Sequence, residues 1–458
     1  MIIRNLKDMQ EMMSGDGLAN EYEKLLVQGV SIDSRTIKKG NLFIPIVRIK
    51  DGHKYVKEAM AKGAIASLWD KSHSDPPKNT PLIFVENTLT ALQTLANSYR
   101  KQLPTKVIGV TGSNGKTTVK DMVNSIVSTK FKVHKTKGNL NSQIGLPLTI
   151  LEVSESDEVM VLEMGMSERG QIERLSNIAQ PDIVIITMIG LSHIGNLGSR
   201  KEIANAKLEI LTGLKDNGLV VYNGDEPLLQ KLKKLKNKRL FRYHTFGKAK
   251  ENDLHPSSVS VDSEEVRFCT NSENSPTYTI SLMGKHNVYN ALASIAVGKE
   301  FGMKEEDIVQ GLKDLNITDM RMQKLTSAKG FTIINDAWNA SPSSVQAAID
   351  TLQKLSGYNK KFLVLADMLE LGDKEEEYHK NIGRLIDPSK IDFLFTYGPL
   401  SKFISNEARK NLGKERVNIF TDKNDIAKKI ITIANPCDIV LIKGSRGMAL
   451  EDVVKRLL

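Results

Sequence analysis

The sequence predicts an α/β protein whose sheets are mostly parallel. Runs typical of buried strands alternate with helical stretches in two separate parts of the chain, first after residue 106 and again after residue 316. Such alternation favours parallel sheets with helices on both faces. A stretch of short β-like runs separates the two parts, and 458 residues are enough for about three domains of ~150 residues each.

The elements follow one another in a simple order. Residues 1 to about 100 mix short strands and helices and end in a helical stretch at 88–100, after which Pro104 interrupts the chain. From Val107 the chain reads as a strand, a helix, the strand VMVLEM at 159–164, the strand DIVIITMI at 182–189 and another helix. This part of the chain is therefore expected to form a parallel sheet.

The second half of the chain repeats the pattern after an interruption. Short β-like runs lie between 219 and 283, and a helix is expected from near Asn287. After about Asn316, strands followed by helical stretches are predicted at FTIINDA (331–337), KFLVLADM (361–368), IDFLFTYG (391–398), VNIFTD (417–422) and DIVLIKGS (438–445). A second, mostly parallel sheet is therefore expected at the C-terminal end.

Charge and composition limit the classes of function. A net charge of +10 suits anionic ligands, either small phosphates or nucleic acid. The densest basic run, at 230–244, is interpreted as a solvated helix face, because no nucleic-acid-binding signature accompanies it. Cys269 and Cys437 are far apart and indicate a reduced cytosol rather than a disulfide framework. The N-terminus lacks the apolar core of a signal peptide, and the longest apolar run, at 183–191, is too short to span a bilayer.

The stretch VIGVTGSNGKTTVKDMV, at 107–123, predicts a phosphate-binding loop. In the common pattern G-x-x-x-x-G-K-[ST] the first glycine would fall at Val110, so the turn differs from the usual one. The context is nevertheless right, because an apolar helical face follows the loop at Val119, Met122, Val123, Ile126 and Val127. Backbone N–H groups at such a helix start favour phosphate, Lys116 can reach the terminal phosphates, and Thr117 can offer its hydroxyl to Mg²⁺. We favour this interpretation over a chance glycine turn.

Two further side chains are placed to complete a metal site. Glu163 ends one predicted strand, and His193 follows the end of another. Ligands of open α/β sheets bind beyond the carboxyl ends of the strands, so both side chains are expected to face the phosphate loop. Their convergence with a phosphate-loop lysine favours a metal role over a structural one.

Lys207 lies in the apolar stripe of a predicted helix. Ser199 and Glu202 match a capping box, so the helix is expected to begin near Arg200. Its apolar stripe consists of Ile203, Ala204, Leu208, Ile210, Leu211 and Leu214. A lysine among them either extends to the helix edge or is driven towards its neutral, nucleophilic form, and periodicity alone leaves both alternatives open.

At this point the chain resembles the Mur ligases of peptidoglycan synthesis. The loop GVTGSNGKTT matches that family's G-x-T-G-x-N-G-K-T spacing, which explains the unusual turn. The resemblance continues through GNLNSQIGLPLTIL (138–151), GKHNVYNALAS (284–294), RMQ (321–323), NDAWNASP (335–342) and LIKGSRGMALE (441–451). The N-terminal SIDSRTIKKGNLFIPI and DGHKYV resemble the UDP-binding domain of the family's later ligases, so the likeness covers essentially the whole chain.

The resemblance implies both an architecture and a reaction. It implies a UDP-substrate domain at 1–103, a central ATPase domain at 104–316 with a parallel sheet and a smaller β part, and a Rossmann-like domain at 317–458. The motifs are closest to the member that uses ATP and Mg²⁺ to join D-Ala-D-Ala to UDP-N-acetylmuramoyl-tripeptide through an acyl phosphate. It further implies a cytoplasmic monomer that serves cell-wall synthesis and hence cell shape and division. Lysine and diaminopimelate stay open as the third residue of the peptide.

The resemblance also assigns roles to residues. ATP would be bound by Gly112, Ser113, Asn114, Gly115, Lys116, Thr117, Thr118, Asn287, Asn290, Arg321 and Asp336. Thr117 and Glu163 would hold one Mg²⁺, and Glu163, His193 and Lys207, as a carbamate, would hold a second. The catalytic set is therefore Lys116, Glu163, His193 and Lys207, while the substrate would be bound by Ser34, Arg35, Asn139, Asn141 and Gln143.

Three departures from the family pattern and three alternatives accompany this interpretation. Ser142 stands where asparagine is frequent, Trp338 stands where tyrosine is common, and IVRIKDGH lacks the glycine that usually precedes the DGH element. The nearest alternative is another amide ligase of the superfamily, either the ligase that adds the third peptide residue or folylpolyglutamate synthase. The first of these would carry a DNPR-like motif, which the sequence lacks. A nucleic-acid-stimulated ATPase and a non-catalytic nucleotide-binding scaffold are the alternatives from other classes.

Overall fold

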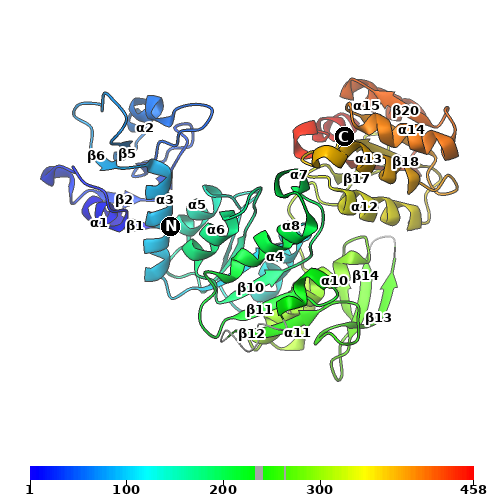
Figure 1. Ribbon diagram of the computed structural model, residues 1–458, viewed down its shortest axis with the longest axis horizontal. Helices are drawn as coiled ribbons and strands as arrows, with labels where there is room; N and C mark the ends of the chain where they lie inside the picture. Colours follow the sequence, from blue (N-terminus) through cyan, green and yellow to red (C-terminus); the bar gives the residue numbers. More distant parts are fainter. Residues whose placement is uncertain (233–240, 263–264) are drawn as a thin grey trace.

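The computed structural model describes residues 1–232, 241–262 and 265–458. Figure 1 shows an elongated molecule in which the N-terminal, central and C-terminal parts of the chain follow one another, each built around its own sheet. The predicted α/β class with mostly parallel sheets is confirmed. Most of the basic run at 230–244 falls on residues 233–240, outside the described residues, so the helix expected there is not part of this description.

The N-terminal part contains an antiparallel strand pair, β1-β2, and a parallel sheet in the order β3-β4-β5-β6. Its strands are β1 (Ile3–Asn5), β2 (Leu26–Gln28), β3 (Val30–Ser31), β4 (Leu42–Phe43), β5 (Ala66–Asp70) and β6 (Leu82–Val85). Its helices are α1 (Leu6–Met12), α2 (Val56–Ala61) and α3 (Thr88–Gln102), with the short 3₁₀ turns η1 (Asn20–Tyr22) and η2 (Gly52–Tyr55). The helix predicted at 88–100 is α3, and Asn87 caps it by accepting a hydrogen bond from the Thr90 N–H at 2.9 Å.

The central part is built on a fully parallel sheet in the order β12-β11-β10-β7-β9-β8. Its strands are β7 (Lys106–Thr111), β8 (Val133–Lys135), β9 (Val159–Glu163), β10 (Ile183–Ile186), β11 (Leu219–Asn223) and β12 (Arg242–Phe246). Its helices are α4 (Lys116–Val127), α5 (Gly145–Glu152), α6 (Gln171–Ala179), α7 (Ile194–Leu197), α8 (Arg200–Leu208), α10 (His286–Glu300) and α11 (Glu305–Lys313), with the 3₁₀ turns η3 (Glu209–Leu211) and η4 (Pro227–Leu229).

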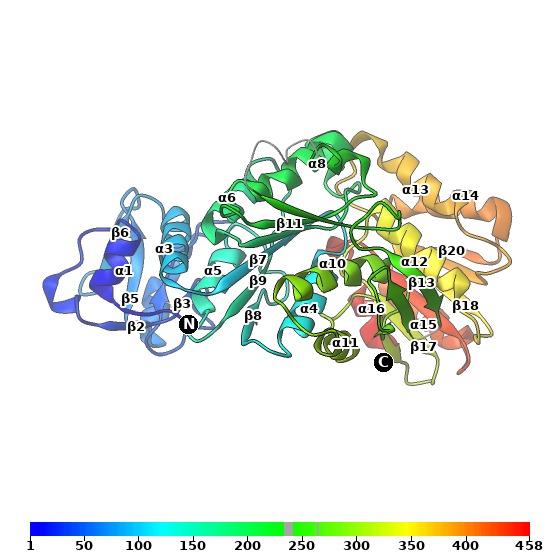
Figure 2. The same ribbon diagram turned by 90° about the horizontal axis from the view of Figure 1, so that it is seen from below.

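Successive residues of this sheet enter different cores. In β7, Val107 belongs to a core that continues into the N-terminal part, whereas Ile108 and Val110 belong to the core beneath α4 and α10. This alternation is the period of two that a strand imposes on its side chains. Figure 2 shows α6 and α8 on one side of the sheet and α4, α10 and α11 on the other, so both faces are covered, as a parallel sheet requires.

The β-like runs expected between 219 and 283 form two structures. The first, LVVYN, is β11 of the parallel sheet. The others form a separate antiparallel sheet in the order β13-β14-β15, with bounds Pro256–Val261, Val266–Thr270 and Tyr278–Ile280. This is the smaller β part that was expected beside the parallel sheet.

The C-terminal sheet has the order β16-β17-β21-β18-β19-β20 and is parallel except for β16 at one edge. Its strands are β16 (Gln323–Thr326), β17 (Thr332–Asp336), β18 (Lys361–Ala366), β19 (Phe393–Tyr397), β20 (Val417–Phe420) and β21 (Ile439–Lys443). Its helices are α12 (Pro342–Lys354), α13 (Glu375–Arg384), α14 (Ser401–Leu412), α15 (Lys423–Ile433) and α16 (Glu451–Leu457), with the 3₁₀ turns η5 (Gly372–Lys374) and η6 (Arg446–Met448). Each of the five predicted strands is present and is followed by a helix.

The connection between the central and C-terminal parts is attached to α4. Thr318 donates hydrogen bonds from its backbone N–H at 2.9 Å and its hydroxyl at 2.8 Å to Asp121 Oδ2. Asp121 is completely buried and also accepts from Lys135 Nζ at 2.7 Å. Because α4 begins at the phosphate loop, this connection starts from the same helix that positions the loop.

Two local expectations need correction. The strand predicted over 182–189 ends at Ile186, so His193 does not follow a strand end directly but comes after a buried loop. The capping box at Ser199 is only half formed, because Ser199 Oγ accepts from the Glu202 N–H at 3.2 Å while the Glu202 side chain pairs with Arg169. The predicted helix start at Arg200 is nevertheless confirmed.

Within the described residues, Cys269 and Cys437 are both free thiols. The same residues contain no helix whose length and apolar character would allow it to cross a membrane.

Candidate active site

A cavity of about 760 Å³ is lined by residues of both the central and the C-terminal parts. It gathers most of the residues that the sequence singled out. Those that line it are Ser113, Asn114, Gly115, Lys116, Thr117, Thr118, Asn139, Asn141, Glu163, His193, Asn287, Asn290, Arg321 and Asp336.

The order of strands explains why these residues meet. β7 lies between β9 and β10, so the loop after β7 is flanked by Glu163 at the end of β9 and by the segment that follows β10. This is the carboxyl edge of a parallel sheet, where ligands of such sheets bind.

The phosphate loop is fitted closely to its neighbours. Gly112 has φ +150°, and a Cβ added there would lie 1.8 Å from Thr187 Oγ1. Gly115, the N-cap of α4, has φ +83°, and a Cβ there would lie 2.7 Å from Asn290 Oδ1. Both positions therefore need glycine, for backbone conformation as well as for space. The glycines of the loop thus lie where it contacts Thr187, just after β10, and Asn290 of α10. Their spacing differs from that of the common pattern.

Lys116 is folded back on this loop. Its ammonium donates to the carbonyl of Gly112 at 2.9 Å and, at 3.4 Å, to that of Ser113. Burial lowers the pKa of Lys116, although the Glu163 carboxylate acts in the opposite direction. A cation held among carbonyl oxygens with little solvent is poised to exchange them for phosphate oxygens.

Thr117 and Glu163 form the centre of the candidate metal site. Thr117 Oγ1 donates to Glu163 Oε2 at 2.7 Å, and Asn141 Nδ2 donates to Glu163 Oε1 at 2.8 Å. Glu163 is 2 % exposed and Thr117 is also 2 % exposed. A buried carboxylate paired with a hydroxyl is the kind of hard oxygen donor set that Mg²⁺ prefers.

His193 is held in an unusual backbone conformation next to the C-terminal part. It precedes α7 with φ +62°, and its buried Nδ1 is in contact with Glu370 Oε2. The two atoms are in close contact, but the ring N–H and the carboxylate oxygen are not aligned as a hydrogen bond requires. Burial lowers the pKa of His193, and Lys116 and Lys207 lower it further, against the effect of Glu370.

Lys207 is buried within its helix stripe and is 2 % exposed. Its side chain therefore does not extend to solvent at the helix edge, which removes one of the two alternatives that periodicity left open. Burial lowers the pKa of Lys207 well below its usual value, and the charge of Lys116 adds to this effect. A lysine in such a place is driven towards the neutral amine, which is nucleophilic.

The remaining predicted nucleotide residues stand around the loop. Asn287 Nδ2 donates to the Met283 carbonyl at 2.8 Å, and Asn290 Nδ2 donates to Asn287 Oδ1 at 3.0 Å. Asp336 forms an ion pair of 2.6 Å with Lys443, whose side chain is 4 % exposed. The Asp336 carboxylate is therefore fixed in place before any ligand arrives.

The structure adds C-terminal residues to which sequence reasoning gave no role. The ring of Trp338 has Arg446 Cζ 4.9 Å and Arg321 Cζ 5.8 Å from its centroid, so two cations face one aromatic side chain. Ser343 Oγ accepts from Asn114 Nδ2 at 2.8 Å, which joins the phosphate loop to the start of α12. The segments NDAWNASP and LIKGSRGMALE contain most of these residues. The sequence therefore marked these segments as motifs but did not indicate which side chains contact one another.

Other predicted residues lie outside the cavity lining. Gly112 and Lys207 are buried and are not among the lining residues. Gln143 is held by hydrogen bonds with α3 and α6. Ser34 and Arg35 belong to the N-terminal part, where Ser34 is buried and Arg35 pairs with Asp33 at 2.6 Å. The side chain of Arg35 is 81 % exposed, and it holds the pKa of Asp33 at about 2.

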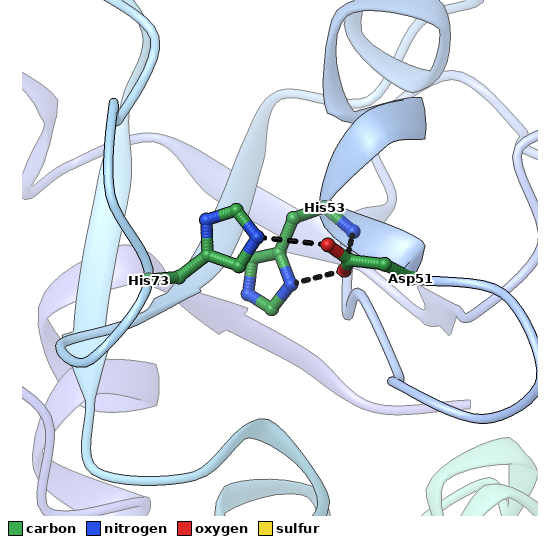
Figure 3. Close-up of side chains that lie close together, drawn as sticks. All are labelled: Asp51, His53 and His73. Carbon is green, nitrogen blue, oxygen red and sulfur yellow. Dashed lines mark hydrogen bonds and ion pairs between the residues drawn. The ribbon is translucent and has the colours of Figure 1, made fainter.

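A second polar cluster lies in the N-terminal part, away from the cavity. Figure 3 shows the Asp51 carboxylate beside the stacked rings of His53 and His73, with one oxygen directed at each ring. Asp51 Oδ1 lies 2.8 Å from His53 Nδ1, and Asp51 Oδ2 lies 2.8 Å from His73 Nε2. The rings stack at a centroid distance of 4.2 Å.

The partners of these rings define their protonation. His53 Nε2 accepts from the Asp70 N–H at 3.3 Å, so it is Nδ1 that donates to Asp51. Both nitrogens of His73 face oxygen acceptors, Asp51 and the Ser74 carbonyl, which only an imidazolium satisfies. The hydrogen bond with Asp51 accordingly raises the pKa of His73. The polar atoms of the three side chains form hydrogen bonds with one another and with the nearby backbone. The cluster therefore links η2 to the connection between β5 and β6.

Comparison with known proteins gives a consistent result. Residues 110–298 match the Mur ligase middle domain, and residues 320–446 match the Mur ligase, glutamate ligase domain. The UDP-N-acetylmuramoyl-tripeptide–D-alanyl-D-alanine ligase of Bacillus subtilis is 48% identical over 460 residues, which cover 100% of this chain and 99% of the relative.

Solved structures agree with the sequence relatives. A crystal structure of MurF from Acinetobacter baumannii superposes with a TM-score of 0.89 at 26% identity, over 100% of this chain and 99% of that chain. The MurF ligase of Thermotoga maritima in complex with ADP superposes with a TM-score of 0.82 at 28% identity, over 94% of this chain and 97% of that chain.

Proposed function

The chain belongs to the Mur ligase family, and from this premise we propose which of its residues carry out the reaction. Its function is that of an ATP-dependent amide ligase, which joins D-alanyl-D-alanine to UDP-N-acetylmuramoyl-tripeptide in peptidoglycan precursor synthesis. The observation that carries this assignment is the 48% identity along the whole chain to a ligase of that name.

The chemistry sets the demands on the site. A carboxylate does not react with an amine at a useful rate, because an oxide ion is a poor leaving group. The terminal carboxylate of the tripeptide therefore attacks the γ-phosphorus of ATP, which forms an acyl phosphate and releases ADP. The amine of D-Ala-D-Ala then attacks the acyl carbon and loses a proton, and the tetrahedral intermediate expels inorganic phosphate to leave the amide. Several anionic oxygens meet at the phosphoryl transfer, so the site must offset their charge.

We assign the offsetting charge to Lys116 and the phosphate contacts to the loop. The backbone N–H groups of residues 112–118 at the start of α4 bind phosphate oxygens, and Lys116 exchanges its carbonyl partners for the γ-phosphate. Asn287 and Asn290 are proposed on the adenine side, Arg321 at phosphate, and Asp336 at the ribose or the phosphates. Their positions around one cavity support these roles.

The donor atoms fit a Mg²⁺ ion. Thr117 and Glu163 would hold one ion, and their hydroxyl–carboxylate contact of 2.7 Å supports this because both oxygens can face the same cation. Glu163, His193 and Lys207 as a carbamate would hold a second. When bound, Mg²⁺ supplies positive charge that stabilises the oxygens of the transferring phosphoryl group.

The burial of Lys207 supports the proposed carbamate. Its neutral amine attacks CO₂, a nitrogen–carbon bond forms, and one proton passes to solvent, leaving an anionic carboxylate on Nζ. The lowered pKa of Lys207, caused chiefly by burial, supports the supply of neutral amine. The change replaces a buried cation with an oxygen ligand for a hard metal ion.

We propose that the elongated substrate extends from the N-terminal part to the cavity. Ser34 and Arg35 would bind the uridine diphosphate, which can replace Asp33 as the partner of the exposed guanidinium. Asn139, Asn141 and Gln143 would line the muramoyl-peptide side. The corresponding domains are proposed at 1–103, 104–316 and 317–458, boundaries supported by the ends of α3 and α11 and the start of β16.

We further propose that the protein acts as a monomer in the cytoplasm, where its two thiols stay reduced. An ADP-release assay tests the function directly. ADP release should require both a nucleotide-linked tripeptide and D-Ala-D-Ala, and the lysine and diaminopimelate tripeptides are compared side by side. Equal turnover with a single free amino acid in place of the dipeptide would rule out the assignment.

A further inference from the structure

The candidate metal site touches the C-terminal part at one specific joint. The joint consists of residues 193–195, which lead into α7, and residues 370–372, which lead into η5. His193 and Glu370 both have φ +62° although neither is glycine. Such conformations cost roughly 1 kcal/mol or more and persist where the surroundings determine them. Two residues in such conformations, with their side chains in contact between the central and C-terminal parts, indicate that the packing at this joint is specific.

The backbones at this joint are too close for other residues. The Gly195 N–H donates to the Glu370 carbonyl at 3.0 Å. A Cβ on Gly195 would lie 2.8 Å from the Gly372 nitrogen, and one on Gly372 would lie 2.9 Å from the Gly195 Cα. Ile194 packs against both the core of the central part and the core of the C-terminal part. The two segments therefore fit each other in one arrangement.

The side-chain contact acts on a specific ring nitrogen. Glu370 Oε2 is in contact with Nδ1 of His193, so the negative charge of the carboxylate favours the proton on Nδ1 rather than on Nε2. Nε2 is then the nitrogen with a free lone pair. Histidines that bind metals almost always have their other ring nitrogen held by such a carboxylate or carbonyl group.

We propose that Glu370 is a positioning residue that orients His193 for metal binding from the opposite domain. The proposal rests on the proposed role of His193 as a metal ligand. Because Glu370 belongs to the C-terminal part, the metal site has its complete support only when that part is docked on α7. Docking of the C-terminal part and assembly of the metal site are thereby one event.

A simple surface ion pair is the alternative, since the side chain of Glu370 is 52 % exposed and such pairs contribute little to stability. The two interpretations differ in what they predict for metal affinity. A positioning residue changes the binding of the ion, whereas a surface pair changes neither metal nor nucleotide binding.

The experiment measures Mn²⁺ affinity by electron paramagnetic resonance, on the full chain with a non-hydrolysable ATP analogue. Glu370→Ala should raise the dissociation constant for Mn²⁺ by about 10-fold to 100-fold. Glu370→Gln, which keeps the size of the side chain, should lose less. Glu377→Ala is the matched control, because Glu377 lies in the adjacent helix α13 and is exposed, and it should bind Mn²⁺ as the wild type does.

A double variant separates positioning from a direct role. If Glu370 acts through His193, the Glu370→Ala/His193→Ala variant should bind Mn²⁺ no more weakly than His193→Ala alone. Losses that add in the double variant would overturn the proposal. An unchanged affinity in both Glu370 variants, with a clear loss in His193→Ala, would overturn it while leaving the metal role of His193 intact. An unchanged affinity in His193→Ala would instead refute the proposed metal site itself. Should Glu370→Ala fail to fold by thermal unfolding, the comparison rests on Glu370→Gln.

Discussion

Gly112→Ala tests whether the phosphate loop binds nucleotide in the conformation described above. The new Cβ would stand 1.8 Å from Thr187 Oγ1, at a residue with φ +150°. The backbone conformation costs ~1–3 kcal/mol for a residue with a side chain. Overpacking adds ~1–3 kcal/mol, because Thr187 belongs to the buried end of the segment after β10 and has little room to move. The loop should therefore move away from Thr187 into a different conformation.

The matched control is Gly170→Ala. Gly170 has φ +80°, but a Cβ there would meet no atom within 4 Å. Its cost is the left-handed backbone conformation alone, ~1–2 kcal/mol. Gly112→Ala should therefore weaken ADP binding, measured by isothermal titration calorimetry, by roughly 30-fold if the loop must recover ~2 kcal/mol to bind. Gly170→Ala should bind ADP as the wild type does.

A second substitution tests the cause of the loss. Thr187→Ala removes the hydroxyl and leaves Thr187 Cβ at 3.1 Å and the Met188 nitrogen at 3.3 Å as the nearest atoms. The hydroxyl also donates to the Asn114 carbonyl at 2.6 Å, so Thr187→Ala alone serves as the reference for the double variant. Adding Gly112→Ala to Thr187→Ala should therefore weaken ADP binding less than adding Gly112→Ala to the wild type. ADP affinity within a few-fold of wild type in Gly112→Ala, or an equal loss in both backgrounds, would refute the steric reasoning.

Three more substitutions test other parts of the molecule. Lys116→Ala should lower kcat at least ~100-fold in the ADP-release assay, because it removes charge that offsets the γ-phosphate; a loss of only a few-fold would count against its role. Lys207→Ala and Lys207→Arg should keep the wild-type thermal midpoint but lose turnover and the ¹³C carbamate signal obtained with ¹³CO₂; an active Lys207→Arg enzyme would exclude the carbamate. The raised pKa of His73 adds stability that is complete below its unfolded value of ~6.5 and is lost as pH rises through the folded value. Urea unfolding of His73→Gln should therefore lack this decline above neutral pH, and an unchanged decline would contradict the imidazolium–Asp51 contact.

Elements whose pattern is local could be predicted from the sequence. The strand, loop and helix at 107–123 were recognisable because the alternating and helical periods and the glycines all lie within one short stretch. The end of β10 could not be predicted, since the apolar run continues past Ile186 to residue 191. Thr187 and Ile189 are buried in the loop beside the phosphate loop, so they are as apolar in their surroundings as the strand itself. Hydrophobicity alone does not distinguish a residue that is buried in a strand from one that is buried in a loop next to the phosphate loop.

Contacts between distant segments were likewise beyond sequence reasoning. Lys207 could be placed in an apolar stripe, but only the fold decides that it is buried rather than extended to solvent. No local pattern links His193 to Glu370. Their side-chain contact and their left-handed backbone conformations both depend on how the C-terminal part packs against the central part. The edge strand β16 was missed because its register is set by pairing with β17 and its side chains show no apolar run.

The anchoring of Thr318 to Asp121 makes the start of the C-terminal part a fulcrum. Arg321 is three residues beyond it, so its Cα lies within ~11 Å of Thr318. Any rotation of the C-terminal part about Thr318 would therefore move Arg321, which lines the cavity, less than parts of this domain that lie farther from Thr318.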